Sequence, residues 1–244
     1  MGPEGPEDRN ERILEVLRGR RITPVFQPIV ELDTGKVIAL EALSRFPGDP
    51  AHSPDRWFAD AWAVGLGTEL ELLAVRMIAK ALPEIPPEVG LSINASPPTI
   101  AARSFLRNLG CEPHRITVEL TEQLDIEDVT GLRSALAPLA DAGGKTAIDD
   151  FGSGYANLQH IIGVDPDWIK LDITITERIH ENSVTHALAS SLVGFAADIN
   201  AGVIAEGIET EEELDALQEI GVRFGQGFHL GMPLPLDEAL EAAA

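Results

Sequence analysis

Two adjacent aspartates, Asp149 and Asp150, follow a short apolar run that begins at Thr146. The run is typical of a buried strand, and Gly152 with Gly154 indicates the turn that ends it. Neighbouring carboxylates at a strand end repel each other unless a positive group lies beside them, and a divalent cation with oxygen ligands suits this role best. A single aspartate would equally suit an Asx turn that caps the next helix. For the pair, the sequence favours a metal site.

Other predicted strands also end in polar residues. The series is Glu41, Asn94, Glu119, Asp149 with Asp150, Lys170, Glu206 and Gln226. Any one of these residues alone is more typical of a cap or a solvated edge. Barrel active sites form at the carboxyl ends of strands, so the repeated pattern predicts that these distant residues meet at one mouth.

The residue types in this series define its chemistry. Oxygen ligands from Glu, Asn and Asp, without His or Cys, suit Mg²⁺ or Mn²⁺ and argue against zinc. A cluster this acidic can hold two cations, with one aspartate bridging them. Two such metals activate a water and stabilise both oxygens of an in-line phosphoryl displacement. Lys170, beside that water, could hold it in place or help to deprotonate it.

The elements that must position these residues begin with a hairpin. Residues 23–32 and 36–43 read as strands, and Asp33-Thr34-Gly35 between them is a turn signal, so the first two strands should be antiparallel. After the hairpin, strands alternate with helices, which is typical of a parallel sheet with right-handed crossovers. With about eight strands, the chain predicts a TIM-like (β/α)8 barrel, although an open doubly wound sheet has a similar pattern.

Helix signals mark several of the crossovers. Thr68 with Glu71, and Thr210 with Glu213, each predict a capping box at a helix start. Residues 98–109 predict one helix that Gly110 ends.

Length and charge limit the function classes. The chain has 244 residues, enough for one domain, and we expect residues 1–20 to form a tail and surface helix and residues 21–244 the domain. A net charge of −22 argues against binding duplex DNA or an anionic membrane by bulk attraction. The N-terminus lacks the features of a secretory signal, the apolar runs are too short to span a bilayer, and the single cysteine, Cys111, fits a reducing compartment. We therefore expect a cytoplasmic protein.

Several separate motifs in register also resemble one family. They are Q-P-I-V (27–30), E-A-L-S-R (41–45), S-I-N-A-S (92–96), E-L-T-E (119–122), D-D-F-G-S-G-Y (149–155), K-L-D (170–172), A-E-G-I-E-T (205–210) and Q-G-F (226–228). Together they resemble the EAL-domain phosphodiesterases, which hydrolyse cyclic di-GMP to linear pGpG in bacterial second-messenger signalling. The resemblance runs from about Thr23 to Pro235. It implies a barrel whose first strand is antiparallel.

The resemblance also implies roles for individual residues. The implied ligands of the first metal are Glu41, Asn94, Glu119 and Asp149, and those of the second are Asp149, Asp150 and Glu206. Lys170 would contact the attacking water, Glu122 would anchor the loop after Asp150, and Glu209 and Gln226 would support the site. The implied substrate-binding set is Gln27, Leu43, Arg45, Asp172 and Gln226, with Arg45 as a charge-assisted phosphate donor.

Cofactors and partners follow from the same resemblance. We expect two Mg²⁺ or Mn²⁺ ions, inhibition by Ca²⁺, and a homodimer formed by the segment after Asp150 and neighbouring helices. A sensor domain or partner protein would lie outside this chain. The sequence departs from the family pattern at Ala156-Asn157, where two serines are usual, and at Phe46, where tryptophan is common.

Three alternatives remain open from the sequence. A receptor that binds cyclic di-GMP without cleaving it would share most motifs, but the complete ligand set argues against it. A metal-dependent hydrolase of another phosphodiester would leave Gln27 and Arg45 unexplained. A glycosidase needs two acids at a set separation, not a crowd of acids with an asparagine and a lysine.

Overall fold

The first two strands form the predicted antiparallel hairpin. β1 (Thr23–Glu31) pairs with β2 (Lys36–Arg45), and the turn between them contains Gly35 at a φ of 70°. Glycine adopts this left-handed conformation without the clash that a side chain would cause.

In a computed structural model of the protein, the residues described are 5–48, 52–121, 129–152 and 162–242.

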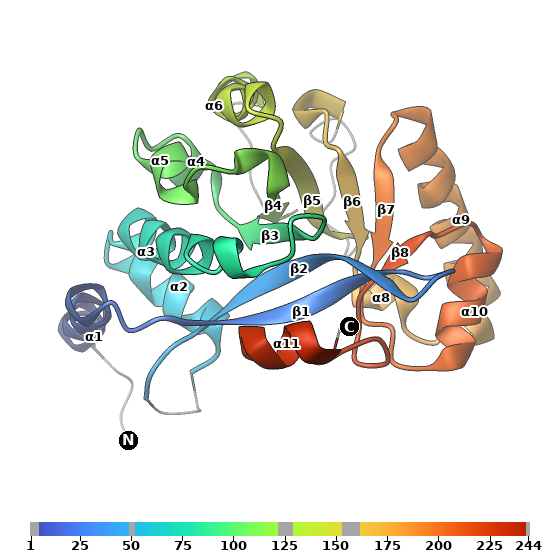
Figure 1. Ribbon diagram of the computed structural model, residues 1–244, viewed down its shortest axis with the longest axis horizontal. Helices are drawn as coiled ribbons and strands as arrows, with labels where there is room; N and C mark the ends of the chain where they lie inside the picture. Colours follow the sequence, from blue (N-terminus) through green and yellow to red (C-terminus); the bar gives the residue numbers. More distant parts are fainter. Residues whose placement is uncertain (1–4, 49–51, 122–128, 153–161, 243–244) are drawn as a thin grey trace.

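The strands close into a barrel in sequence order (Figure 1). The remaining strands are β3 (Gly90–Asn94), β4 (Ile116–Thr121), β5 (Lys145–Phe151), β6 (Trp168–Leu171), β7 (Gly202–Ala205) and β8 (Phe224–Gly225). Pairing is parallel from β2 to β8, whereas β1 is antiparallel to both of its neighbours. The prediction of a TIM-like barrel with an antiparallel first strand is therefore confirmed.

Helices surround the barrel and cover its outer surface. Those in the described residues are α1 (Pro6–Gly19), α2 (Pro54–Ala63), α3 (Gly67–Ala79), α4 (Pro97–Ile100), α5 (Phe105–Leu109), α6 (Val129–Asp141), α8 (Ile173–Thr176), α9 (Ser183–Asp198), α10 (Glu211–Glu219) and α11 (Leu236–Ala242), with short 3₁₀ turns at Leu82–Glu84, Pro113–Arg115 and Ile179–Glu181. Apolar strand and helix residues such as Leu91, Ile116 and Leu136 form the main core between the two layers. Burying these apolar faces is what drives the helices onto the sheet.

A second, smaller apolar cluster lies outside the barrel core. It joins α1 to α2 and α3 through buried residues that include Ile13, Val16, Trp57 and Leu70. α1 is therefore packed against the rest of the protein, and Figure 1 shows it beside α2 and α3.

The helix signals had mixed outcomes. Thr210 and Glu213 form the predicted capping box of α10. The box predicted at Thr68 is wrong, because α3 begins at Gly67 and the carboxylate of Glu71 is bonded elsewhere. The single helix predicted over 98–109 is also wrong: α4 and α5 are two short helices. The sequence also predicts a helix from about Tyr155 to Ile162, and this segment lies mostly outside the described residues.

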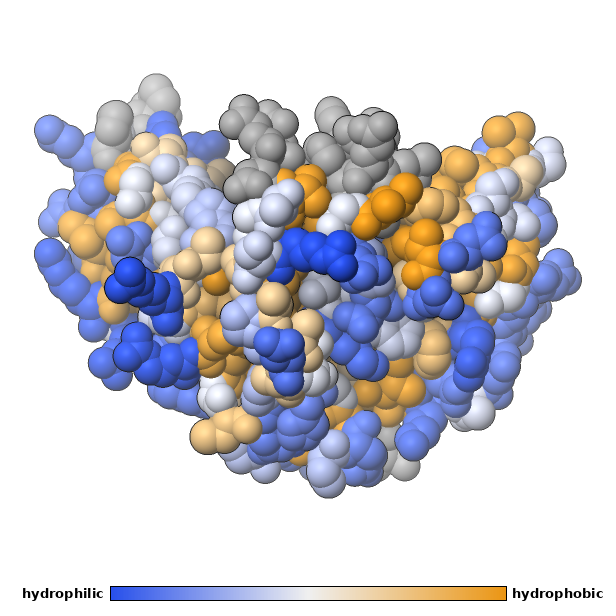
Figure 2. All heavy atoms as spheres, turned by 90° about the horizontal axis from the view of Figure 1, so that it is seen from above, coloured by the Kyte–Doolittle hydropathy of each residue, from blue (hydrophilic) through white to orange (hydrophobic). Residues whose placement is uncertain are grey.

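Within the described residues, no helix combines the length and the apolar character needed to cross a membrane. Figure 2 shows one face of the molecule, on which hydrophilic side chains predominate and apolar ones form smaller patches between them. This surface agrees with the many charged residues of the chain.

Candidate active site

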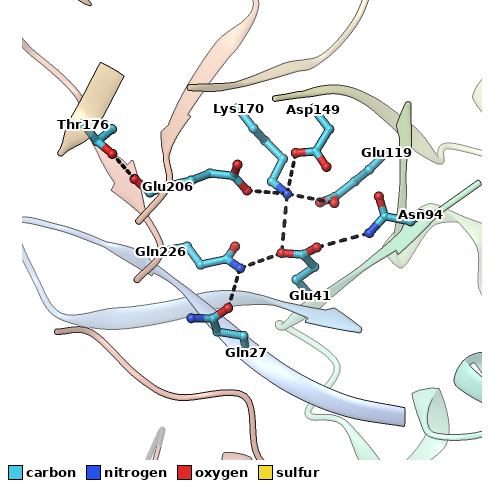
Figure 3. A network of polar contacts seen from close by, with 9 residues as sticks. All are labelled: Gln27, Glu41, Asn94, Glu119, Asp149, Lys170, Thr176, Glu206 and Gln226. Atoms are coloured by element: carbon cyan, nitrogen blue, oxygen red, sulfur yellow. Dashed lines mark hydrogen bonds and ion pairs between the residues drawn. The ribbon is translucent and has the colours of Figure 1, made fainter. Parts of the chain in front are cut away.

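The polar residues at the strand ends converge on one mouth of the barrel, as Figure 3 shows. Strand register aligns them, since Gln27 lies opposite Glu41 and Asn94 lies beside Glu119. The residues that meet are Gln27, Glu41, Asn94, Glu119, Asp149, Lys170, Glu206 and Gln226. Seven of these residues belong to the strand-end series, whose convergence the sequence pattern predicted. Gln27 lies within β1 and was not part of that series.

Lys170 lies at the centre of four carboxylates. Its Nζ is 2.7 Å from Glu206 Oε1, 2.9 Å from Glu119 Oε2, 2.9 Å from Asp149 Oδ1 and 3.4 Å from Glu41 Oε2. Lys170 and Glu119 are fully buried. One ammonium can neutralise only one carboxylate, so the group carries a surplus of buried negative charge. Such a surplus is costly unless protons or further cations compensate it.

The buried carboxylates differ in the direction in which their pKa is shifted. Burial and then the charge of Glu41 hold the pKa of Glu119 well above its usual value. Burial raises the pKa of Glu206 to about 8. The positive charge of Lys170 acts against this shift, and the negative charge of Asp149 adds to it. For Glu41, burial favours the neutral carboxyl group, but the positive charge of Lys170 and the hydrogen bonds from amide donors outweigh this effect and lower the pKa. Burial also opposes the charge of Lys170, yet the carboxylates, Glu119 foremost, keep its pKa well above the usual value. Lys170 is thus a cation at neutral pH.

Asp149 and Asp150 lie on a β-bulge. Between Ile148 and Phe151, β5 carries one residue more than the facing stretch of β6. Consecutive residues of a regular strand point to opposite faces, which would separate the two carboxylates. The bulge, with Asp150 in the left-handed region at a φ of 56°, instead brings oxygens of both aspartates within 4.8 Å of each other and of Glu206. Aspartate tolerates this conformation better than most residues do.

Amide side chains orient Glu41. Gln226 Nε2 donates to Glu41 Oε2 and, at 2.9 Å, to Gln27 Oε1. Gln27 Nε2 donates to the carbonyl of Gly231 at 3.0 Å, and Asn94 Nδ2 donates to Glu41 Oε1 at 3.2 Å. Both oxygens of Glu41 are therefore held by hydrogen bonds, one from Asn94 at the end of β3 and one from Gln226 directly after β8.

Comparison with known families decides the identity of this barrel. The model of the EAL domain matches residues 10–233. The chain belongs to the EAL domain family. The resemblance read from the motifs is thereby confirmed.

This EAL domain is similar to curated proteins and to solved structures. It is 28% identical over 246 residues to the probable cyclic di-GMP phosphodiesterase PdeB of Escherichia coli (strain K12), covering 96% of this chain and 47% of PdeB. The PaMucR phosphodiesterase, solved as a c-di-GMP complex, superposes with a TM-score of 0.79 at 26% identity, covering 94% of this chain and 98% of that one.

Klebsiella pneumoniae BlrP1 is another similar structure. Its manganese/cy-diGMP complex at pH 6 has a TM-score of 0.79 and 32% identity, covering 88% of this chain and 56% of that one. Its calcium/cy-diGMP complex at pH 8.0 has a TM-score of 0.79 and 30% identity, covering 96% of this chain and 68% of that one. The chain spans less than half the length of the first curated relatives that it matches.

The donor set of this EAL domain fits hard divalent cations. Asp149, Asp150 and Glu206 form a group of three carboxylates close enough to share one ion. Glu119 Oε1 is buried and has no hydrogen-bond partner among the described residues. A buried carboxylate oxygen without a donor is costly unless a cation or proton compensates it.

The remaining predicted site residues occupy different positions. Arg45 is exposed at the end of β2, with Leu43 half-buried two residues earlier on the same strand. Asp172 caps α8 by accepting a hydrogen bond from the backbone N–H of Thr174 at 2.9 Å. Glu209 is exposed, and Glu122 lies outside the described residues.

Two buried glutamates that the site predictions did not include hold the loops around this EAL site. Glu213 accepts hydrogen bonds from the backbone N–H groups of Arg178 at 2.8 Å, Glu209 at 2.9 Å and Thr210 at 3.1 Å. It therefore ties the loop that follows Glu206 to the segment after α8. Its capping-box position was visible in the sequence, but its bond to Arg178 was not.

Glu71 plays the same part beside Asn94. Its Oε2 accepts from the backbone N–H and the Oγ of Ser96 at 2.9 and 2.7 Å, while its Oε1 accepts from Trp62 Nε1 at 2.9 Å. α3 is thereby connected to the loop that directly follows Asn94. No local pattern indicates this bond, because Glu71 and Ser96 are distant in the sequence.

The metal-free protein should lose stability as the pH rises. Between 4.5 and about 8, folded Glu206 keeps a proton that the unfolded chain has released. The folded state therefore binds more protons in this window, and the free energy of unfolding decreases as the pH increases. Because the side chain of Glu206 is 18% exposed, we expect a total loss of about 2–3 kcal/mol across the window.

Urea unfolding in EDTA at both ends of this pH window measures the effect. Glu206→Gln, which has no proton to release, is the matched control and should show a shallower dependence on pH. Equal dependence in the two proteins would contradict the assignment to Glu206.

Proposed function

We propose that this EAL domain hydrolyses cyclic di-GMP to linear pGpG with divalent cations, in bacterial second-messenger signalling. The observation that carries the proposal is the buried carboxylate group around Lys170. Relatives named as cyclic di-GMP phosphodiesterases support the choice of substrate. Because the chain covers only part of these relatives, the activity of the whole protein belongs to the same proposal.

We assign the oxygen ligands of two cations to this site. The residues that would hold the first are Glu41, Asn94, Glu119 and Asp149, and those that would hold the second are Asp149, Asp150 and Glu206. Bound cations would neutralise the surplus carboxylate charge and polarise the phosphate for attack. A ligand set made of oxygens favours Mg²⁺ or Mn²⁺. For Asn94, the ligand atom would be Oδ1, since Nδ2 donates to Glu41.

Lys170 would hold the attacking water as a hydrogen-bond donor. The surrounding carboxylates keep its pKa well above the usual value, so Nζ carries protons to donate and is a poor base. Of the two roles that the sequence left open, this one agrees with the electrostatics. The water oxygen would form the new bond to phosphorus while the bond from phosphorus to the 3′ oxygen breaks. One proton of the water would end on that 3′ oxygen, and the product would be pGpG.

Substrate would be bound in the mouth and at its rim. The residues that we assign to it are Gln27, Leu43, Arg45, Asp172 and Gln226. Arg45 is exposed and would donate charge-assisted hydrogen bonds to a phosphate. Glu122 and Glu209 would act as supporting residues of the catalytic loops.

A receptor that binds cyclic di-GMP without cleaving it is the alternative. It would need the rim residues but not a central lysine with a full set of acids. The chain retains every one of the implied metal ligands, which supports the enzyme.

We further propose a homodimer in the cytoplasm, controlled by a sensor domain or partner protein. Four exposed large apolar side chains fall between residues 162 and 188, namely Ile162, Ile173, Val184 and Leu188. They support an interface near the segment that follows Asp150, part of which lies outside the described residues. Sedimentation velocity tests the dimer.

Residues 1–20 and 21–244 remain our proposed division into an N-terminal segment and an EAL domain.

Chromatography of cyclic di-GMP incubated with the protein and Mg²⁺ tests the activity. We expect linear pGpG as the product, because the site has all the acids and the lysine that the reaction needs. Unchanged substrate at high enzyme concentration, with either Mg²⁺ or Mn²⁺, would favour the receptor.

A further inference from the structure

The N-terminal helix is fixed to α2 by buried charge. Asp60 on α2 is only 2% exposed. Its carboxylate lies 2.7 Å from Arg12 Nη2, 3.1 Å from Arg56 Nε and 3.7 Å from Arg9 Nη1. Arg9 and Arg12 belong to α1, so two residues of this helix converge on one buried acid. A buried ion pair fixes geometry more strictly than an exposed one, since breaking it strands a charge away from water.

Aromatic contacts continue from this ion-pair group towards the barrel. The guanidinium carbon of Arg12 lies 4.2 Å from the ring centre of Trp57. Trp57 in turn stacks on Phe46 with ring centres 4.9 Å apart and an angle of 11° between the planes. Phe58 packs edge-on against Phe46 at 5.4 Å. Arg12, Trp57 and Phe46 thus form one continuous stack, which we call the rim stack.

The rim stack ends beside a candidate substrate residue. Phe46 directly follows Arg45, the last residue of β2. Strand alternation places Arg45 on the same face as Glu41, four residues earlier, and directs Phe46 away from that face. On β1, Thr23 pairs with Arg45, and its neighbour Ile22 belongs to the same apolar cluster as Trp57. Residues on both strands therefore attach this end of the hairpin to α1 and α2.

We propose that Arg12, Trp57 and Phe46 are positioning residues that hold Arg45 ready for a phosphate of the substrate. The docking of α1 would then set substrate affinity from outside the barrel. This inference rests on the proposed function for its substrate, but the mechanical link between α1 and the rim does not depend on it. Holding a long side chain in place before binding lowers the entropic cost of association.

Arg12→Met tests the link. It removes the guanidinium from Trp57 and Asp60 and should speed hydrogen exchange of the amides at residues 42–46, while amides of β4 to β6 keep their protection. With cyclic di-GMP and Mg²⁺, KM should rise about threefold to tenfold, as expected for one less-ordered side chain. The kcat should stay within about twofold, because no group at the reacting phosphate has changed.

Phe46→Leu breaks the stack without touching the ion pairs of Asp60, so it gives the same test if Arg12→Met does not fold. Glu15→Gln is the matched control, because Glu15 also lies on α1, and its replacement breaks an exposed ion pair with Arg21, which follows the helix, but leaves the stack intact. It should change neither exchange nor KM.

Unchanged exchange at residues 42–46 in both stack variants would overturn the proposal, as would faster exchange with an unchanged KM. A fall in kcat alone would mean a merely structural role and would also overturn it. If the wild-type protein neither binds nor cleaves cyclic di-GMP, the proposed function fails, and the exchange data still decide whether α1 holds the rim.

Discussion

Glu41→Ala should lower kcat for cyclic di-GMP on the order of a thousandfold, because it removes a proposed metal ligand and a contact of Lys170 together. The carboxylate of Glu41 connects several side chains of the site, since Gln226, Asn94 and Lys170 all contact it. Without it, Lys170 and the amides lose the oxygen atoms that orient them. Product formation followed by chromatography measures the loss.

Glu219→Ala is the control for this variant. Glu219 is an exposed glutamate at the end of α10 and belongs to none of the predicted motifs. It should retain wild-type turnover. Thermal unfolding of both variants shows that they are folded. A folded Glu41→Ala protein with near wild-type kcat would refute our assignment of the metal ligands.

Replacing Mg²⁺ by Ca²⁺ should separate binding from cleavage. Calcium accepts oxygen ligands at about 2.3–2.6 Å, compared with about 2.0–2.1 Å for magnesium, and it tolerates looser geometry. A carboxylate-rich cluster such as this one should therefore still bind Ca²⁺. Chemistry is more demanding, because a displacement of about 1 Å can cost on the order of a hundredfold in rate. We expect cyclic di-GMP to bind in Ca²⁺ and to remain uncut.

Calorimetry and chromatography on the same sample test this prediction. The sample is the wild-type protein with cyclic di-GMP in Ca²⁺. Calorimetry should show binding of the dinucleotide, and chromatography should show that it is not cleaved. Cleavage in Ca²⁺ at the Mg²⁺ rate would mean that the cations only neutralise charge. Our account of the mechanism would then be wrong.

The architecture was largely readable from the sequence, because its signals are local. The turn at Asp33-Thr34-Gly35 joins two strands that pair directly, so a short segment fixed the antiparallel start of the barrel. The alternation of strands and helices, together with polar residues at strand ends, then predicted which side chains meet. The mouth is formed by the ends of all parallel strands, so the order of these residues along the chain mattered little.

Contacts between distant segments were not readable in the same way. Glu71 stands where a capping box was predicted, but it bonds Ser96 instead, since the fold brings that loop within reach. The same holds for Glu213 and the backbone of Arg178. Local propensity cannot rank a nearby partner against one that only the folded chain supplies.

The sequence by itself determined the family, the barrel and the residues of its mouth, because motifs and strand ends carry that information in short segments. Only the tertiary structure decided how those residues are used. It placed Lys170 among four carboxylates, turned Asp150 into the mouth by a bulge, and joined α1 to Arg45 through Trp57 and Phe46. Each of these depends on the packing of elements that are far apart in the chain, and burial there sets both the charge balance and the geometry.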